Sequence, residues 1–365
     1  MAIGTIPKTM KALVAYGKGD YRLEQNYPTP ECGPDDIIIK TEGCGICAGD
    51  LKCMHGVAKF WGDDIQPRWV KPPFIPGHEF FGRVVQIGEN VKDYKIGDRL
   101  TSDQIVPCGK CRFCRTGHYW MCQPHDMYGY QYYNNGGMAE YVKYLPNSIN
   151  MGTVYKVPEE LPFEKAVLVE PYACSKHAVD RAGITNDDVV VISGAGTLGL
   201  GMITYARMKN PKKLIVLDMK ANRLEKAKEF GADEVYNPGE CNIDEVIKGE
   251  TDGYGCDIYI EATGNPASVR QGLTIIRKLG TFVEFSVFGS ETSVDWSIIG
   301  DSKELDIRGS HLSPYTYPFV MENMMNGNLK TDGVVSHIFT LDDWEKAFDL
   351  ATGKEGDFKV VFKFD

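Results

Sequence analysis

The chain has 365 residues, of which 43% are hydrophobic and 25% are charged, and its formal net charge at pH 7 is -10. This length allows two domains with separate cores, and the composition is that of an ordinary globular protein. The acidic balance and the lack of a run rich in lysine and arginine argue against nucleic-acid binding. With no stretch of ~20 apolar residues and no signal-peptide pattern, we expect no membrane association and a cytoplasmic location.

The first 170 residues are predicted to form a β-rich domain. Short apolar runs such as K-A-L-V-A-Y, D-I-I-I-K and G-R-V-V-Q-I-G alternate with glycine and proline. Regular spacing of short strands is typical of barrel-like β folds.

Two motifs in this region, and one at its end, carry side chains that bind metals. Cys47 lies in G-C-G-I-C-A-G-D, His78 and Glu79 in F-I-P-G-H-E-F-F-G, and Glu170 in V-L-V-E-P-Y-A-C. A thiolate, an imidazole and a carboxylate leave one coordination position open, which is the pattern of a catalytic zinc. Taken singly, each is more typical of a buried small residue or a loop, but together they predict a zinc site.

The segment between these ligands contains the insertion K-F-W-G-D-D-I-Q-P-R-W-V. Its side chains could wall a polar pocket, although a surface loop with packed tryptophans fits the same sequence. Polar aromatic residues near residue 310 could add hydroxyl-binding groups, or could serve only packing. These pocket candidates are Trp61, Asp63, Trp69, His311, Tyr315 and Tyr317.

A compact cysteine cluster follows, C-G-K-C-R-F-C-R-T-G-H-Y-W-M-C, with Cys108, Cys111, Cys114 and Cys122. Four thiolates on one loop can close a tetrahedral zinc site with no open position, so this site is predicted to be structural. Two disulfides or four free thiols are the alternative, but eleven cysteines without a secretion signal favour a reducing compartment. The flanking Lys110, Arg112 and Arg115 are expected to lower the pKa of the thiols.

From about residue 171 the pattern changes to alternating strands and helices, which predicts βαβ units on a parallel sheet. The buried strand Val189–Ile192 is followed by G-A-G-T-L-G, the turn that places a dinucleotide pyrophosphate at a helix N-terminus. A second strand ends at Asp218, whose carboxylate would accept ribose hydroxyls and repel a 2′-phosphate, so NAD is favoured over NADP. Arg223 lies near and is interpreted as a solvated helix charge, although it remains a cofactor-binding candidate. The motif residues are Gly194, Gly196, Thr197, Leu198 and Gly199.

The order of these motifs over nearly the whole chain resembles the zinc-dependent medium-chain alcohol dehydrogenases. Glu79 directly after the histidine, and Glu170 before Pro171, are more similar to the polyol and threonine dehydrogenases of that superfamily. Segments such as H-G-V-A-K-F-W-G-D are similar to bacterial erythritol/L-threitol dehydrogenases in particular. The resemblance implies a two-domain α/β fold, with a GroES-like catalytic domain (1–170 and 311–365) and a doubly wound Rossmann domain (171–310).

The resemblance also implies roles near the first ligand. Asp50 resembles the family aspartate that orients the ligand histidine, and this role is preferred over that of a turn aspartate or helix cap. Where relatives carry a serine or threonine that relays the alcohol proton, this chain has Gly49, and Lys52 stands where many have a relay histidine. Water, with Lys52 or His55 beyond it, would then have to complete the proton route, or the alkoxide would depend on zinc alone.

We therefore expect an enzyme that uses one catalytic zinc, one structural zinc and NAD to oxidise a secondary alcohol of a small polyol, such as threitol or erythritol, to a ketose. An L-threonine dehydrogenase, or another zinc-dependent alcohol dehydrogenase, fits the same motifs. A non-catalytic nucleotide-binding protein of the same fold is the alternative from another class. The resemblance further implies a homo-oligomer, a dimer or a tetramer, and it leaves open whether Glu79 or Glu170 binds the catalytic zinc.

Overall fold

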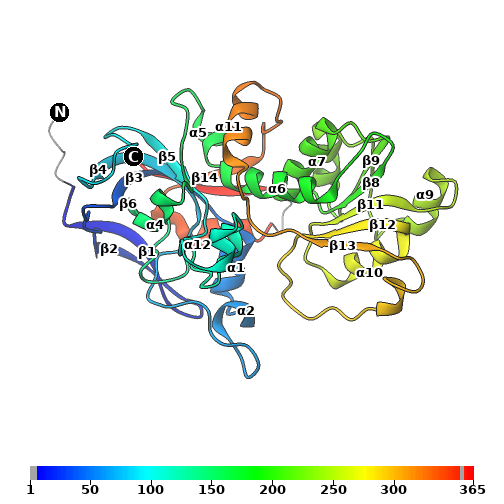
Figure 1. The fold of residues 1–365 in the computed structure, drawn as a ribbon, viewed down its shortest axis with the longest axis horizontal. Coiled ribbons are helices and arrows are strands. Elements are labelled where there is room, and N and C mark those ends of the chain that lie inside the picture. Colours follow the sequence, from blue (N-terminus) through cyan, green and yellow to red (C-terminus); the bar gives the residue numbers. More distant parts are fainter. Residues whose placement is uncertain (1–5, 354–356) are drawn as a thin grey trace. The chain divides into compact units, whose positions relative to one another are not determined.

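The computed structural model describes residues 6–353 and 357–365. The chain forms two compact units (Figure 1). The first unit contains the chain up to Glu170, together with Tyr317–Asn326 and Thr331–Asp365, and the second contains Pro171–Thr316 and Gly327–Lys330. The chain therefore leaves the first unit directly after one of the predicted metal ligands.

The first unit is built on a seven-stranded sheet in the order β14-β15-β3-β4-β5-β7, with β6 paired to β3. The β14–β15 pair is parallel, the other pairs are antiparallel, and β1 and β2 form a separate two-stranded sheet. The strands are β1 (Thr9–Gly17), β2 (Asp20–Pro28), β3 (Ile37–Gly45), β4 (Glu79–Ile87), β5 (Arg99–Ser102), β6 (Tyr141–Tyr144), β7 (Val154–Lys156), β14 (Val335–Phe339) and β15 (Lys359–Lys363).

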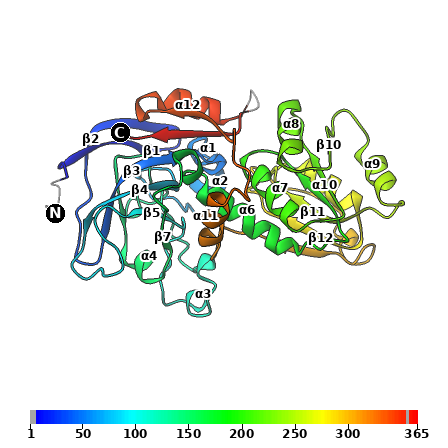
Figure 2. The same cartoon turned by 90° about the horizontal axis from the view of Figure 1, so that it is seen from above.

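Helices of the first unit are short and fill the connections between strands, except for α12, which packs along β15 (Figure 2). They are α1 (Ala48–Met54), α2 (Ala58–Trp61), α3 (Arg112–Arg115), α4 (Pro146–Asn150), α5 (Phe163–Ala166), α11 (Tyr317–Met325) and α12 (Trp344–Ala351), with 3₁₀ turns η1 (Tyr119–Met121) and η3 (Leu341–Asp343).

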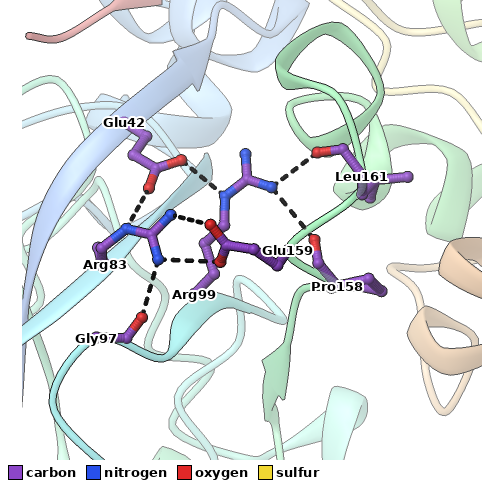
Figure 3. A network of polar contacts seen from close by, with 7 residues as sticks. All are labelled: Glu42, Arg83, Gly97, Arg99, Pro158, Glu159 and Leu161. Carbon is purple, nitrogen blue, oxygen red and sulfur yellow. Dashed lines mark hydrogen bonds and ion pairs between the residues drawn. The ribbon is translucent and has the colours of Figure 1, made fainter.

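A polar network fastens three strands to the segment that leads toward Glu170 (Figure 3). Glu42 on β3 accepts hydrogen bonds from Arg83 Nε on β4 at 3.1 Å and from Arg99 Nε on β5 at 2.7 Å. Arg99 Nη1 also donates to the Leu161 carbonyl at 2.7 Å, while Arg83 Nη2 donates to Glu159 Oε1 at 2.8 Å. The network thus fixes residues 158–161 against the sheet, a few residues before the carboxylate at position 170.

The second unit contains a six-stranded parallel sheet in the order β10-β9-β8-β11-β12-β13. Its central strand β8, V-V-V-I-S, is buried over its whole length because helices cover a parallel sheet on its faces. This strand order places a switch point between β8 and β11, where α/β sheets bind ligands.

The strands of the second unit are β8 (Val189–Ser193), β9 (Lys213–Leu217), β10 (Glu234–Tyr236), β11 (Cys256–Glu261), β12 (Ile276–Glu284) and β13 (Asp306–Gly309). Its helices are α6 (Val169–Ala182), α7 (Thr197–Met208), α8 (Ala221–Phe230), α9 (Ile243–Glu250), α10 (Pro266–Ile275) and the 3₁₀ turn η2 (Trp296–Ile298). Across residues 6–353 and 357–365, none of the helices has the length and apolarity needed to span a bilayer.

Candidate active site

Three of the predicted ligands meet where β3 ends and β4 begins. Cys47 is the N-cap of α1, two residues after the end of β3. His78 directly precedes β4, and Glu79 is the first residue of β4. The antiparallel ladder pairs Gly45 with Glu79, so the end of one strand lies beside the start of the other. As a result, one ligand atom from each of the three side chains lies within 4.8 Å of the others.

Asp50 lies where it could serve both roles that the sequence left open. Its Oδ2 accepts a hydrogen bond from the Cys47 backbone N–H at 2.9 Å, which caps α1. Its Oδ1 faces His78 Nδ1 at 3.6 Å, with both side chains buried. Because His78 Nδ1 faces Asp50, Nε2 is the ring nitrogen that is left for a metal.

The site is strongly negative. Burial alone would lower the pKa of His78, but the neighbouring carboxylate of Asp50 and thiolate of Cys47 raise it to about 10. The same charges favour any cation placed among these side chains. The donor set and its charge therefore fit a divalent zinc ion with an open coordination position.

Lys359, which the sequence analysis missed, lies against the carboxylate of Glu79. Its Nζ donates to Glu79 Oε1 at 2.7 Å and also to Oε2 and to the Ile46 carbonyl, and only 4% of the residue is exposed. Burial alone would lower the pKa of Lys359, but Glu79 and Cys47 raise it above its ordinary value. An ammonium group thus neutralises part of the charge that Glu79 offers to a metal.

Glu170 is buried near the start of α6 and stands outside the tight group of three. Its Oε1 accepts a hydrogen bond from Gln104 Nε2 at 3.0 Å. It is close enough to contribute to the raised pKa values of His78 and Lys359. Gln104, like Lys359, carried no signal in the sequence, because its role depends on a contact between residues far apart in the chain.

The four cysteines 108, 111, 114 and 122 form the second group, with their sulfur atoms within 4.8 Å of one another. No disulfide joins these four cysteines in the structure, so the disulfide alternative is not favoured. Backbone N–H groups of the loop point at the sulfurs: Cys108 N donates to Cys122 Sγ at 3.2 Å, and Cys111 N donates to Cys108 Sγ at 3.3 Å. Such a loop is preorganised for a closed metal site.

The expectation that the flanking basic residues lower the pKa of these thiols was wrong, because burial raises the pKa of Cys114 and of Cys122, and no basic residue accounts for the lowered pKa of Cys111. The pKa of Cys111 is lowered to about 6, chiefly by the backbone N–H of Cys114 and then by that of Gln123. Lys110, Arg112 and Arg115 are exposed to solvent. Solvent screens their charges, whereas the loop's own N–H groups contact the sulfurs directly.

The glycine motif of the second unit forms the predicted turn between β8 and α7. Gly194 has a φ of 107°, and a Cβ at this position would lie 2.8 Å from the Ala262 carbonyl oxygen. A Cβ on Gly199 would lie 1.9 Å from the Gly194 carbonyl, so only glycine allows this helix-to-strand contact. Gly196 caps α7, and Thr197 and Leu198 form its first turn.

A cavity of about 370 Å³ opens at this turn, lined by Gly194, Gly196, Asp218 and Arg223 among others. Asp218 Oδ2 accepts from Ala195 N at 2.8 Å, and Oδ1 accepts from Lys220 N at 3.0 Å, which fixes the carboxylate at the rim. Arg223 Nη1 lies 4.0 Å from Asp218 Oδ2. Arg223 lines the cavity with 20% of its side chain exposed, and it remains a cofactor-binding candidate.

The remaining candidates of the first unit divide between packing and surface. Lys52 is half-buried in the last turn of α1, outside the group of three ligands, and His55 is exposed at the C-cap of that helix. Trp61 is buried and donates to the Cys53 carbonyl at 2.7 Å, and Asp63 is exposed and accepts from two backbone N–H groups of its own loop. Tyr317 is fully buried and donates to the Ser102 carbonyl at 2.9 Å.

These contacts favour the packing interpretation for Trp61 and Tyr317. Trp69 is half-buried, donates to the His125 carbonyl at 3.1 Å and packs on aromatic neighbours. In the second unit, His311 is half-buried and Tyr315 is exposed.

Comparisons with known proteins now identify the family. An alcohol dehydrogenase GroES-like domain matches residues 33–159, and a zinc-binding dehydrogenase domain matches residues 197–326. The chain is 47% identical over 354 residues to the erythritol/L-threitol dehydrogenase of Mycolicibacterium smegmatis, with 96% of each chain covered. The chain belongs to the zinc-binding alcohol dehydrogenases.

Other members of this family share the whole length. The chain is 32% identical to the sorbitol dehydrogenase of Macaca fascicularis, over 100% of this chain and 98% of that protein. The structure of a zinc-binding dehydrogenase from Sinorhizobium meliloti, bound to NADP, superimposes with a TM-score of 0.87 at 29% identity and covers 98% of this chain and 100% of that chain. The predicted superfamily, the GroES-like plus Rossmann fold and the class of zinc-dependent oxidoreductase are thus confirmed.

Proposed function

We propose that this zinc-binding alcohol dehydrogenase uses NAD to oxidise a secondary alcohol of a small polyol, a tetritol such as erythritol or threitol, to a ketose. The observation that carries the proposal is the 47% identity, over nearly the full length, to an erythritol/L-threitol dehydrogenase. The grouping of Cys47, His78 and Glu79 within 4.8 Å supports it, because a catalytically idle relative would not need these three donors together.

In this proposal the group of three holds the catalytic zinc, and the four-cysteine loop holds a structural zinc. When bound, the catalytic zinc supplies a Lewis acid for the alcohol oxygen, and NAD accepts the hydride from the carbinol carbon. The chain's own residues fix the donors in advance: Asp50 orients His78, and Lys359 holds Glu79. Buried partners of this kind keep the site ready before substrate arrives.

We propose Glu79 as the carboxylate that binds zinc directly in the described geometry, and Glu170 as the second carboxylate beside it. Glu79 is supported by its place in the group of three, and Glu170 by its hydrogen bond from Gln104. Two carboxylates and a thiolate would over-neutralise a dication and weaken its action on the alcohol. The ion pair with Lys359 lowers the charge that Glu79 brings, so the site keeps its Lewis acidity.

For the cofactor we propose NAD, with the pyrophosphate at Gly194–Gly199 and the adenosine ribose at Asp218. Each carboxylate oxygen of Asp218 already accepts one backbone N–H and has lone pairs left for ribose hydroxyls. A 2′-phosphate at this point would meet the Asp218 charge. Arg223 lines the same cavity, and it could offer the 2′-phosphate of NADP a counter-charge if the Asp218 carboxylate were removed.

The cofactor assignment can be tested by comparing the wild type with Asp218→Ala. In the variant, kcat/KM should fall with NAD and rise with NADP, because the carboxylate no longer repels a 2′-phosphate that Arg223 can contact. The ratio of the two kcat/KM values should shift by about 10-fold or more. Exposed Asp187→Ala should change neither. A wild type that already reduces NADP faster than NAD contradicts the assignment.

The substrate assignment is tested by following NADH formation with a panel of erythritol, D- and L-threitol, sorbitol, L-threonine and simple alcohols. A tetritol should give the highest kcat/KM. A chain that prefers L-threonine remains a zinc-dependent dehydrogenase, but the polyol proposal is then lost.

We also propose that the enzyme works in the cytoplasm as a homo-oligomer, a dimer or a tetramer. The resemblance to the polyol dehydrogenases supports both statements. Light scattering after size-exclusion chromatography measures the subunit number, and a mass of a single 40.7 kDa chain contradicts the oligomer.

A further inference from the structure

The space beside Gly49 is filled by a hydroxyl from elsewhere in the chain. A Cβ built on Gly49 would lie 2.9 Å from Tyr130 Oη, 3.8 Å from Cys47 Sγ and 3.9 Å from His78 Cε1. The position where relatives carry a relay serine or threonine is therefore occupied here by a phenol oxygen. Sequence analysis missed Tyr130, because it lies far along the chain among other tyrosines.

Aromatic packing holds Tyr130 in this place. Its ring stacks on His78 at a centroid distance of 5.6 Å and on Phe60 at 5.6 Å, and it contacts Trp69 at 4.9 Å. The Tyr130 carbonyl also accepts a hydrogen bond from Lys71 N at 3.0 Å. Phe60 and Trp69 come from the insertion that was expected to wall a pocket, so that segment positions the phenol.

The Tyr130 hydroxyl has no hydrogen-bond partner within the part of the chain that the structure describes, although only 4% of the residue is exposed. The Tyr130 O–H group lies beside the ligand cluster, and a phenol O–H can both donate to and accept from a further oxygen atom.

We propose that Tyr130 replaces the missing serine or threonine and forms a hydrogen bond with the reacting hydroxyl of the substrate. This inference rests on the proposed function. As the alcohol loses its proton, Tyr130 Oη accepts that proton and passes its own to water, so the phenol is neutral before and after. The hydrogen and electron pair on the carbinol carbon go to NAD, and the alcohol becomes a ketone.

The same geometry gives Gly49 a purpose. A serine at this position would force its Cβ against the end of a rigid, stacked ring. Once Oη is removed, the nearest atoms are Cys47 Sγ and His78 Cε1, both at ordinary contact distances. The two hydroxyls thus exclude each other, and the chain can carry one or the other.

The decisive experiment compares Tyr130→Phe, Gly49→Ser and the double variant. Tyr130→Phe keeps the stacking and the zinc content but should lower kcat/KM for tetritol oxidation by roughly 100-fold, the usual size of a general acid–base contribution. Gly49→Ser alone should lose activity through the clash, and the double variant should recover most of it. Tyr128→Phe is the matched control, because Tyr128 is fully buried and its hydroxyl bonds to Ser148 instead.

A second readout does not depend on turnover. In protein loaded with cobalt in place of zinc, erythritol binding is followed through the visible cobalt bands without NAD. Tyr130→Phe should raise the Kd for erythritol by about 5- to 10-fold, which corresponds to one lost hydrogen bond. Tyr128→Phe should leave this Kd unchanged.

Unchanged kcat/KM and unchanged erythritol binding in Tyr130→Phe, in a wild type that oxidises tetritols, overturn the inference while the proposed function stands. A double variant no more active than Tyr130→Phe overturns the replacement of one hydroxyl by the other. If the wild type oxidises no alcohol in the panel but Tyr130→Phe still weakens erythritol, the proposed function fails and the Tyr130 contact stands.

Discussion

The two candidate metal centres of the first unit are built in opposite ways. The four-cysteine loop takes all its donors from residues 108–122 and turns its own backbone N–H groups toward the sulfurs. The other centre takes Cys47, His78 and Glu79 from two strand ends and depends on Lys359 near the C-terminus. Four thiolates from one loop fill all the positions of a tetrahedral metal. Three donors from separate segments leave one position for a substrate.

The centres also differ in how their charges are balanced, and they meet at neighbouring residues. Backbone dipoles lower the pKa of Cys111, while a buried lysine and aspartate act on Glu79 and His78. Directly after β5, Asp103 accepts a hydrogen bond from Tyr119 of the cysteine loop at 3.1 Å, and Gln104 donates to Glu170. Of these two consecutive residues, Asp103 therefore contacts the cysteine loop and Gln104 contacts Glu170.

The largest expected effect separates the two sets of ligands. Cys47→Ser should lower kcat by far more than the 10- to 100-fold that even an outer partner of a metal is worth, and should leave the melting temperature close to that of the wild type. Cys111→Ser should keep most of the activity per folded molecule but lower Tm by about 4 °C or more, because a structural zinc contributes to folding.

Elemental analysis provides the check on both cysteine variants. The wild type should contain two zinc ions per chain, and each variant should lose the ion of its own site. If Cys47→Ser instead lowers Tm and Cys111→Ser removes activity, the structural and catalytic assignments are exchanged.

The next effect tests whether the open centre depends on a buried ion pair. Lys359→Met leaves the buried Glu79 carboxylate without its counter-charge and should cost about 3–5 kcal/mol of unfolding free energy in metal-free protein. Added zinc should restore part of this loss, because the metal then neutralises Glu79. The measurement is denaturant unfolding with and without zinc.

Lys363→Met is the control for that comparison, since Lys363 lies exposed at the other end of β15 and should change stability by about 0.5 kcal/mol or less. Equal losses in the two variants would show that Lys359 contributes packing rather than charge to the site.

The smallest effect uses the neighbours Asp103 and Gln104. Asp103→Ala removes the acceptor of Tyr119 and should lower stability by about 1–3 kcal/mol with kcat retained. Gln104→Ala removes one hydrogen bond to Glu170 and should lower kcat about 10-fold or more with a smaller change in Tm. Tm and kcat are measured for both variants. If the two variants show the same changes, Asp103 and Gln104 do not act on separate centres.

Much of the molecule could be predicted from short-range patterns. The run Val189–Ile192 is strand β8, the strand before Asp218 is β9, and the glycines between them form the turn that their spacing indicated. Asp50 was placed beside its histidine by resemblance, and the structure shows it there. The place of Arg223 in the cavity lining could not be predicted, because the exposure of a helix residue depends on which face the sheet and the glycine turn cover.

The amino-acid sequence by itself determined the features whose residues are neighbours along the chain: the cysteine loop, the glycine turn and the alternation of elements in each unit. Their geometry follows from local spacing and backbone hydrogen bonds. Tertiary structure alone decided that Lys359 pairs with Glu79, that Gln104 holds Glu170, and that Tyr130 fills the space left by Gly49. These contacts join residues far apart in sequence, and a lysine, glutamine or tyrosine gives no sign of its partner until the strands and the aromatic cluster bring the two together.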